Sequence, residues 1–160
     1  MASLTRSVRI VVASFSRSAF FRRVGPSVMP RVERVWTVVN RGRTPLSGVL
    51  VPSLVLHTVG AKSGLERDSP LMYCPEPGGV MLITGSNFAR DTHPAWTANL
   101  AANPDAAVTV KGRRIEVRAA RIPDDKLDET WLYIERQWPG YRGYERASGR
   151  TLRIFRLTPR

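Results

Sequence analysis

Hydrophobic and polar residues repeat with two different periods along this chain, and the change of period separates strands from helices. Short apolar runs bounded by Gly, Pro and Asp are typical of strands. One pair of such runs flanks Lys111 and Gly112, a dipeptide suited to a hairpin turn. The strands are predicted at residues 54–59, 69–74, 79–85, 106–121 (a hairpin) and 151–157. About six short strands suit a small β-barrel.

Apolar residues three and four positions apart mark the helices. The predicted helical segments are residues 4–19, 30–39, 94–102 and 123–138. The third begins after Pro94, a residue suited to a first helical turn, and Pro104 follows its end. We therefore predict an α+β fold that is mainly β, in which helices flank a barrel of about six strands.

The length of 160 residues fits one domain, expected at residues 25–160. Residues 1–24 contain five arginines and no acidic residue, and they predict a separate basic amphipathic helix that is retained in the protein. Two interpretations of this helix stay open. It either covers the domain or frays in solvent, or it lies on an anionic membrane surface.

The charge balance predicts an anionic partner. The chain has 25 basic and 13 acidic residues, a formal net charge of +12, and +9 of this excess lies in residues 1–67. The remaining residues are nearly balanced and lack the interleaved basic and aromatic residues of a nucleic-acid surface. We therefore expect no nucleic-acid partner.

Cys74 is the only cysteine, so no intramolecular disulfide can form and a reducing compartment is favoured. His57 and His93 lack the spacing of metal ligands, so no metal is expected. No run of about 20 apolar residues is present for a membrane span. The sequence predicts a cytoplasmic protein, with peripheral contact at the inner face of the cell membrane as the open question of residues 1–24.

The loop after the first predicted strand could bind an anion. Gly60 and Gly64 bracket a turn that holds Lys62, and Arg67 follows closely. Such a turn exposes successive backbone N–H groups beneath positive side chains, an arrangement that suits phosphate or carboxylate. The alternative is that these basic residues are simply solvated.

Two motifs, separated by a strand, favour ligand binding by this loop over simple solvation of its basic residues. The run TVGAKSGLERDSPLMY is followed by a strand ending near Ser86 and then by HPAWTANLAANP. Together, GxKSGxxR and PxWxxNLxANP resemble the deazaflavin-dependent nitroreductase family over most of the chain after residue 30. The resemblance implies a split β-barrel like that of FMN-binding proteins, and an enzyme that uses the deazaflavin coenzyme F420 as hydride donor to quinones or nitroaromatic compounds.

A deazaflavin coenzyme joins a flat tricyclic ring to a phosphodiester and a glutamate tail, so it needs an apolar slot beside a positive loop. Lys62 as a point charge and Arg67 as a bidentate partner suit the anionic end. Trp96 either packs along the slot or belongs to the core. The contacts that the resemblance implies are Ala61, Lys62, Ser63, Arg67, Asp68, Ser69, Pro70, Leu71, Met72, Thr84, Gly85, Ser86, Asn87, Ala95, Trp96, Thr97, Ala98, Asn99 and Tyr141.

Hydride transfer is chemistry of the coenzyme, so the protein needs groups that hydrogen-bond the developing negative oxygen of the acceptor. Tyr141 and Ser86 are the candidates, with Tyr144 in reserve. Ala61, where relatives commonly carry arginine, removes one possible contact to the tail. Asn87 and Phe88 replace a small turn and leave the identity of the acceptor open.

Two alternatives to an F420H2-dependent oxidoreductase remain. The first is an FMN-binding flavoprotein of the same architecture, since the same basic residues could bind the phosphate of FMN. The second is a non-enzymatic basic module that binds nucleic acid or anionic lipid through its N-terminal half. The oligomeric state is not predicted.

Overall fold

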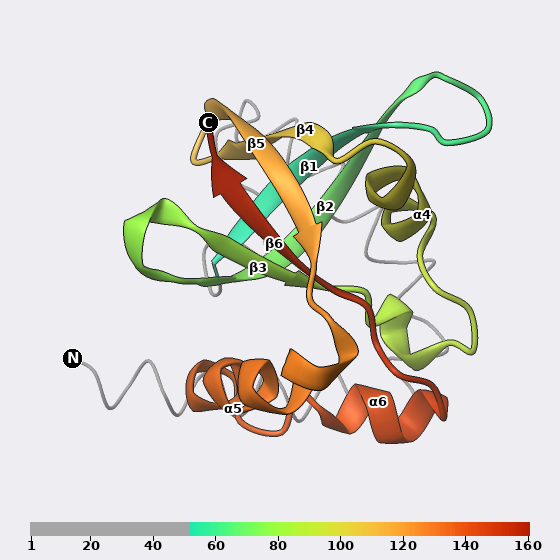
Figure 1. Ribbon diagram of the computed structural model, residues 1–160, viewed down its shortest axis with the longest axis vertical. Coiled ribbons are helices and arrows are strands. Elements are labelled where there is room, and N and C mark those ends of the chain that lie inside the picture. Colours follow the sequence, from blue (N-terminus) through green and yellow to red (C-terminus); the bar gives the residue numbers. More distant parts are fainter. Residues whose placement is uncertain (1–51) are drawn as a thin grey trace, which may run out of the picture.

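The computed structural model describes residues 52–160, in which six strands close into a barrel in the order β1-β2-β3-β6-β5-β4 (Figure 1). Every neighbouring pair in this barrel is antiparallel. The strands are β1 (Ser53–Val59), β2 (Glu66–Pro75), β3 (Met81–Thr84), β4 (Asp105–Val110), β5 (Arg113–Arg121) and β6 (Ile154–Pro159). The predicted small barrel is confirmed.

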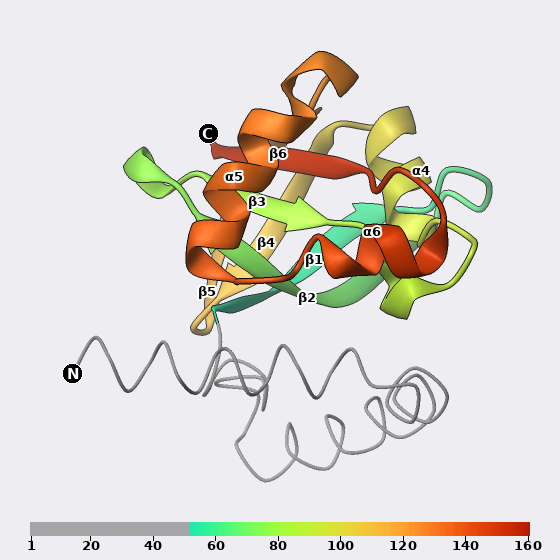
Figure 2. The same ribbon diagram turned by 90° about the horizontal axis from the view of Figure 1, so that it is seen from below.

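Among residues 52–160, three helices pack on the outside of the barrel. The helix α4 (Ala95–Ala102) lies at one side, while α5 (Leu127–Gln137) and α6 (Gly143–Ser148) lie below, alongside β3 and β6 (Figures 1 and 2). Short 3-10 turns are η1 (Pro77–Gly79), η2 (Asn87–Ala89) and η3 (Asp124–Lys126). The predicted helices at 94–102 and 123–138 are confirmed, whereas those at 4–19 and 30–39 lie outside the described residues.

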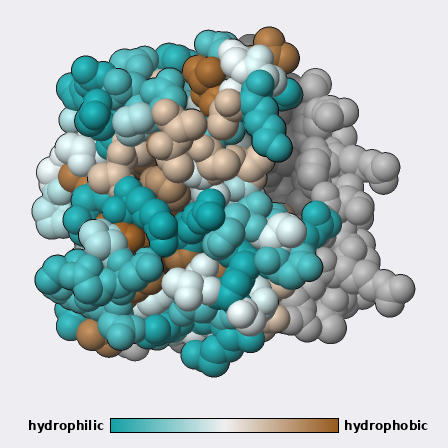
Figure 3. Space-filling view, turned by 45° about the vertical axis from the view of Figure 1, so that its right-hand side comes forward, coloured by the Kyte–Doolittle hydropathy of each residue, from teal (hydrophilic) through white to brown (hydrophobic). Residues whose placement is uncertain are grey.

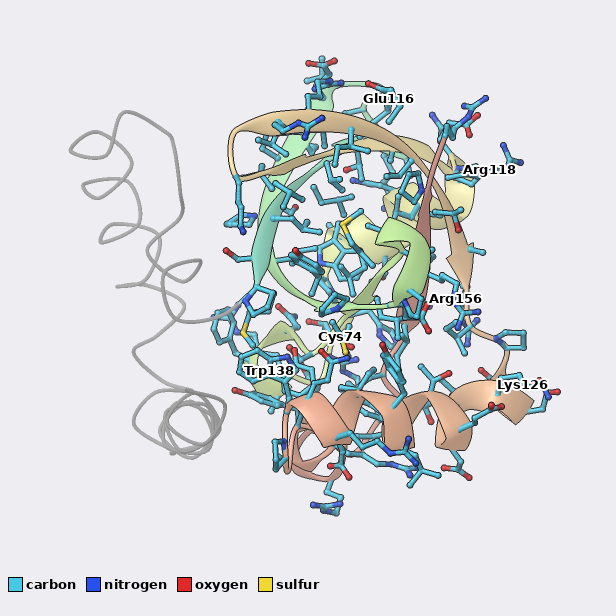
Figure 4. All side chains as sticks on the ribbon, turned by 90° about the vertical axis from the view of Figure 1, so that its left-hand side faces the viewer. Cys74, Glu116, Arg118, Lys126, Trp138 and Arg156 are labelled. Carbon is cyan, nitrogen blue, oxygen red and sulfur yellow. The ribbon has the colours of Figure 1, made fainter. Side chains whose placement is uncertain are left out.

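Strand alternation produces two apolar cores. In β3, Met81 and Ile83 point into the barrel, while Leu82 points outward to the layer under α5 and α6. All three are almost fully buried, so this strand is apolar on both faces. In Figure 4 side chains fill the barrel, and Cys74 and Trp138 lie in the second layer between the barrel and α5. The second core joins the long helix to the barrel.

The start of β2 follows from strand pairing that apolar periodicity does not reveal. The strand β2 was predicted from residue 69, but its ladder with β1 begins at Glu66, opposite Val59. The exposed polar residues 66–68 therefore belong to the strand through its backbone ladder with β1, to which the side-chain pair of Asp68 and His57 adds. The predicted turn between β4 and β5 is confirmed, since Lys111 and Gly112 both have positive φ, at 48° and 77°.

Among residues 52–160, no helix has the length and apolar character needed to cross a bilayer.

Candidate functional site

A small pocket opens in the layer between the barrel and α5. Its lining residues are Met72, Tyr73, Cys74, Leu82, Thr84, Ile134, Trp138 and Tyr141. Three of these, Met72, Thr84 and Tyr141, belong to the predicted site, although they come from β2, β3 and the segment after α5. The cavity volume of about 10 Å³ leaves room for about one water-sized group. A tricyclic ring is larger, so the pocket can offer it a wall but not an enclosure.

The two predicted catalytic residues meet at this pocket. The Tyr141 hydroxyl donates to Ser86 Oγ at 3.5 Å, a long hydrogen bond that a third polar group could replace. The Tyr141 ring packs edge-on against Tyr144, with ring centroids 5.3 Å apart, and lies 6.3 Å from the ring of Trp131. These aromatic contacts fix the direction of the hydroxyl.

Burial keeps the Tyr141 hydroxyl protonated. Desolvation raises its pKa to about 12, and the hydrogen bond with Ser86 opposes the shift only in part. The neighbouring Tyr144 also raises this pKa. A phenol with such a pKa is a hydrogen-bond donor at every physiological pH.

The predicted anion-binding loop is exposed and positively charged. Residues 61–68 are all exposed, and Gly60 accepts the N–H of Gly64 and donates to the carbonyl of Leu65, which closes the turn. A Cβ atom on Gly60 would lie 2.5 Å from Ser63 Oγ and 3.3 Å from the carbonyl oxygen of Leu65, so a larger residue here would displace the Ser63 side chain. Within residues 52–160, neither Lys62 nor Arg67 forms an ion pair. Both charges are available to an anionic ligand.

A buried amide joins this loop to α4. Asn99 is only 7% exposed, and its Oδ1 accepts the N–H of Ala61 at 3.0 Å while its Nδ2 donates to Thr58 Oγ1 at 3.0 Å. The Asn99 side chain therefore fixes the loop instead of facing a ligand. For the same reason the N–H of Ala61, which we expected to help bind an anion, is already occupied.

Alternation along β2 divides the predicted residues 67–72 between two faces. Leu71 packs against the core inside the barrel, whereas Met72 lines the pocket on the outside. Asp68 also points outward, where its carboxylate accepts a hydrogen bond from His57 Nδ1 at 2.6 Å. Of the three implied coenzyme contacts Pro70, Leu71 and Met72, only Met72 lines the pocket.

The predicted coenzyme contacts on α4 are divided between the buried and the exposed face of that helix. Trp96 is 5% exposed and contacts Phe155 edge-on, with ring centroids 5.8 Å apart, so it belongs to the barrel core. Thr97 is fully buried, and its hydroxyl donates to the carbonyl of Pro94. Ala95 and Ala98 are exposed. The side of the molecule that carries α4 shows weakly hydrophobic surface among hydrophilic residues (Figure 3).

The segment between β3 and α4 has an unusual backbone. Asn87, Phe88 and Ala89 all have positive φ, at 46°, 54° and 59°, although none is glycine. A left-handed conformation costs about 1–2 kcal/mol for each residue with a side chain, so this turn needs external support. Part of that support is Asn87 Nδ2, which donates to the carbonyl of Thr92 at 2.8 Å.

Five of the eight residues that line the pocket were not predicted from the sequence. Tyr73, Cys74, Leu82 and Ile134 are apolar or weakly polar residues of strands and a helix, and their pattern predicts only burial. Trp138 ends α5 at its capping position, and no motif marks it as a site residue. Such residues become visible only when two elements that are distant in sequence pack together.

The comparisons with known proteins decide the family. A sequence profile described as F420H(2)-dependent quinone reductase matches residues 31–159, which is most of the chain. The chain belongs to this family. An F420H(2)-dependent quinone reductase of Mycobacterium tuberculosis is 33% identical over 112 residues, which cover 68% of this chain and 74% of that protein.

Solved structures agree with the family. A structure of an F420-H2 dependent reductase (FDR-A) has a TM-score of 0.57 and 27% identity, and the match covers 66% of this chain and 93% of that one. Another, described as a domain-swapped dimer, has a TM-score of 0.60 and 26% identity over 82% of this chain and 98% of that one. The predicted resemblance, the F420-dependent class of oxidoreductase and the coenzyme are confirmed.

The residues present suit the anionic end of this coenzyme better than its ring. Lys62 and Arg67 are cations without an ion pair among the described residues, which is the chemistry that a phosphodiester and carboxylates need. Met72, at the pocket, lies five residues along β2 from Arg67, a separation of roughly 17 Å. An elongated coenzyme is the kind of ligand that could contact both places.

Proposed function

We propose that this protein reduces a quinone with F420H2, and that Tyr141 and Ser86 hydrogen-bond the acceptor at the pocket mouth. The observation that carries the proposal is the neutral Tyr141 hydroxyl, which lies 3.5 Å from Ser86 Oγ at the pocket. A quinone oxygen that gains negative charge accepts hydrogen bonds more strongly than the neutral ground state does. Donors fixed in advance at that oxygen therefore stabilise the transition state selectively.

Bound F420H2 supplies the hydride, which adds two electrons and one proton to the quinone, and one further proton completes the hydroquinone. Tyr141 Oη donates a hydrogen bond to the acceptor oxygen and keeps its own proton, because its pKa is about 12, and solvent supplies the further proton. Ser86 Oγ accepts from Tyr141 in the free protein, and its own O–H serves as the second hydrogen-bond donor to the acceptor oxygen. Lys62 and Arg67 bind the anionic end of the coenzyme through charge-assisted hydrogen bonds.

A nitroaromatic compound is the second candidate acceptor. A nitro group carries two oxygens that become negative on reduction, and the paired hydroxyls of Tyr141 and Ser86 offer two donors at one place. This pairing supports hydride transfer to either acceptor. The identity of the acceptor thus depends on the surface around the pocket mouth more than on the donors.

The direct test measures oxidation of F420H2 by the full chain with menadione, a naphthoquinone without an isoprenoid tail, and in parallel with a nitroimidazole. We expect faster turnover with menadione and saturation in both substrates. FMNH2 serves as the control donor. Turnover with FMNH2 but not with F420H2, or no quinone reduction above the uncatalysed rate, would refute the proposed function.

The role of residues 1–24, as a segment separate from the domain at 25–160, is a second part of the proposal. Their five arginines without an acid support binding to an anionic membrane surface, at about 1 kcal/mol for each basic residue near the leaflet. This would bring the enzyme to lipid-soluble quinones. The test compares co-sedimentation of the full chain and a variant lacking residues 1–24 with phosphatidylglycerol vesicles. Equal binding by the two proteins would rule out this role.

A further inference from the structure

The loop between β3 and α4 has to be held in place from outside. It contains Ser86 and the left-handed residues 87–89, and its own backbone hydrogen bonds are few. Two of them, from Ala89 to Ser86 and from Arg90 to Asn87, each close a single turn. A relaxed loop would carry Ser86 away from Tyr141, to which it is joined by one long hydrogen bond.

The side chain of Arg150 reaches both ends of this loop. Its Nη2 donates to the carbonyls of Gly85 and Ser86, each at 3.1 Å, and its Nε donates to the carbonyl of Arg90 at 2.9 Å. Its Nη1 lies 2.9 Å from Nδ1 of His93 and donates to it when that nitrogen is unprotonated. One guanidinium thus bonds residues at the start, middle and end of the loop.

These contacts need the shape of a guanidinium. Four of its five N–H groups are used, and a lysine ammonium, which is a single point charge on a shorter side chain, cannot reproduce this planar fork. Among residues 52–160, Arg150 forms no ion pair with a carboxylate. Its hydrogen bonds go to the loop and not to an acid on the surface.

The chain before and after Arg150 is itself fixed. Gly149 ends α6 with a φ of 67°, a left-handed conformation that reverses the chain direction. Two residues after Arg150, the N–H of Leu152 donates to Oε1 of Glu145 at 2.9 Å. The Arg150 backbone is therefore held between a helix cap and a side-chain hydrogen bond, so its guanidinium can order the loop instead of following it.

We propose that Arg150 is a positioning residue, which holds the loop of residues 85–93 in its left-handed conformation and thereby keeps Ser86 beside Tyr141. The structural part of this proposal stands on the hydrogen bonds alone. Its consequence for turnover rests on the proposed function of Ser86 and Tyr141.

Hydrogen exchange of the ligand-free full chain tests the structural part. In Arg150→Gln and Arg150→Lys, amides of the loop should exchange roughly ten- to a hundredfold faster, while amides of β1 and β4 keep their rates. The matched control is Arg153→Gln, which removes a positive charge from the same region; the Arg153 side chain donates to the Thr97 hydroxyl on α4, and its contact with the loop is a backbone carbonyl, which the substitution keeps. Loop exchange as slow as in the unmodified protein for Arg150→Lys, or equally fast exchange in Arg153→Gln, would overturn the proposal.

Turnover of F420H2 with menadione tests the consequence. Arg150→Ala should lower kcat about tenfold or more with little change in the dissociation constant of F420, and millimolar guanidinium chloride, but not ammonium chloride, should restore part of it. If loop exchange accelerates while kcat is unchanged, Arg150 still orders the loop and the role of Ser86 and Tyr141 fails. If kcat falls without faster loop exchange, positioning by Arg150 is refuted.

Discussion

Removing the hydroxyl of Tyr141 should lower turnover far more than it lowers stability. The pKa of about 12, against an ordinary value of 10.0, makes ionisation of this phenol less favourable by about 3 kcal/mol. At neutral pH only about one molecule in 100,000 carries a tyrosinate, so the group acts as a donor throughout. A hydrogen bond to an oxygen that develops charge contributes about 1.5–3 kcal/mol. Tyr141→Phe should therefore reduce kcat with menadione roughly 10- to 150-fold.

The stability of this variant should change little. The hydrogen bond that it loses in the free protein is long, at 3.5 Å, and the ring keeps its contacts with Tyr144 and Trp131. We expect the free energy of unfolding of Tyr141→Phe to differ from that of the unmodified protein by no more than about 0.5–1.5 kcal/mol. Urea unfolding measures the free energy of unfolding, and a titration with oxidised F420 measures the dissociation constant of the coenzyme. Both values should stay close to those of the unmodified protein.

The matched control is Tyr133→Phe. Tyr133 lies on α5, and its hydroxyl donates to the carbonyl of Pro75 at 2.7 Å, outside the pocket lining. This change also removes one phenol hydroxyl, but it should leave kcat unaltered. Equal kcat for Tyr141→Phe and the unmodified enzyme, or an equal loss in Tyr133→Phe, would refute the reasoning about Tyr141.

Two further predictions concern stability. Asn99→Ala removes two hydrogen bonds, the one from the N–H of Ala61 and the one to the hydroxyl of Thr58, which keeps only its 3.5 Å bond to the carbonyl of Arg67. Urea unfolding should therefore show a loss of about 2–3 kcal/mol, against about 0.5 kcal/mol for the exposed Asn103→Ala, and equal losses would contradict the bridging role of Asn99. Burial and, after it, the charges of three arginines lower the pKa of His93 below 6.5, so the unfolded chain protonates first as pH falls below 6.5. Stability should then decline with falling pH in the unmodified protein and less steeply in His93→Gln, and parallel curves would contradict this.

The sequence predicted the barrel well because its strands bury one face or both. In β3 the run from Met81 to Ile83 is apolar at every position, and such a run between turn residues has few other uses. The helix α5 was also clear, since Leu127, Trp131 and Ile134 share one buried face. The helix α6 was missed because six residues are too few to show a helical period.

The site was less predictable than the fold. A motif describes one continuous segment of the chain, whereas the pocket is lined by residues of several segments that pack together only in the folded protein. The motif around Trp96 and Asn99 was found, yet both side chains are buried and serve packing or the support of a loop. Arg150 looked like one more surface arginine in a basic chain. Its hydrogen bonds to residues more than 55 positions earlier could not be inferred from spacing.

The central claim is that the exposed cations of the loop before β2 bind the anionic end of F420. The measurement is a fluorescence titration of the full chain with oxidised F420, repeated on Lys62→Ala and Arg67→Ala, with Lys126→Ala as a charge-matched control far along the chain. Each loop variant should raise the dissociation constant about 10-fold or more, as expected for one lost charged hydrogen bond, while the control stays unchanged. Dissociation constants within twofold of the unmodified protein for both loop variants would contradict the account.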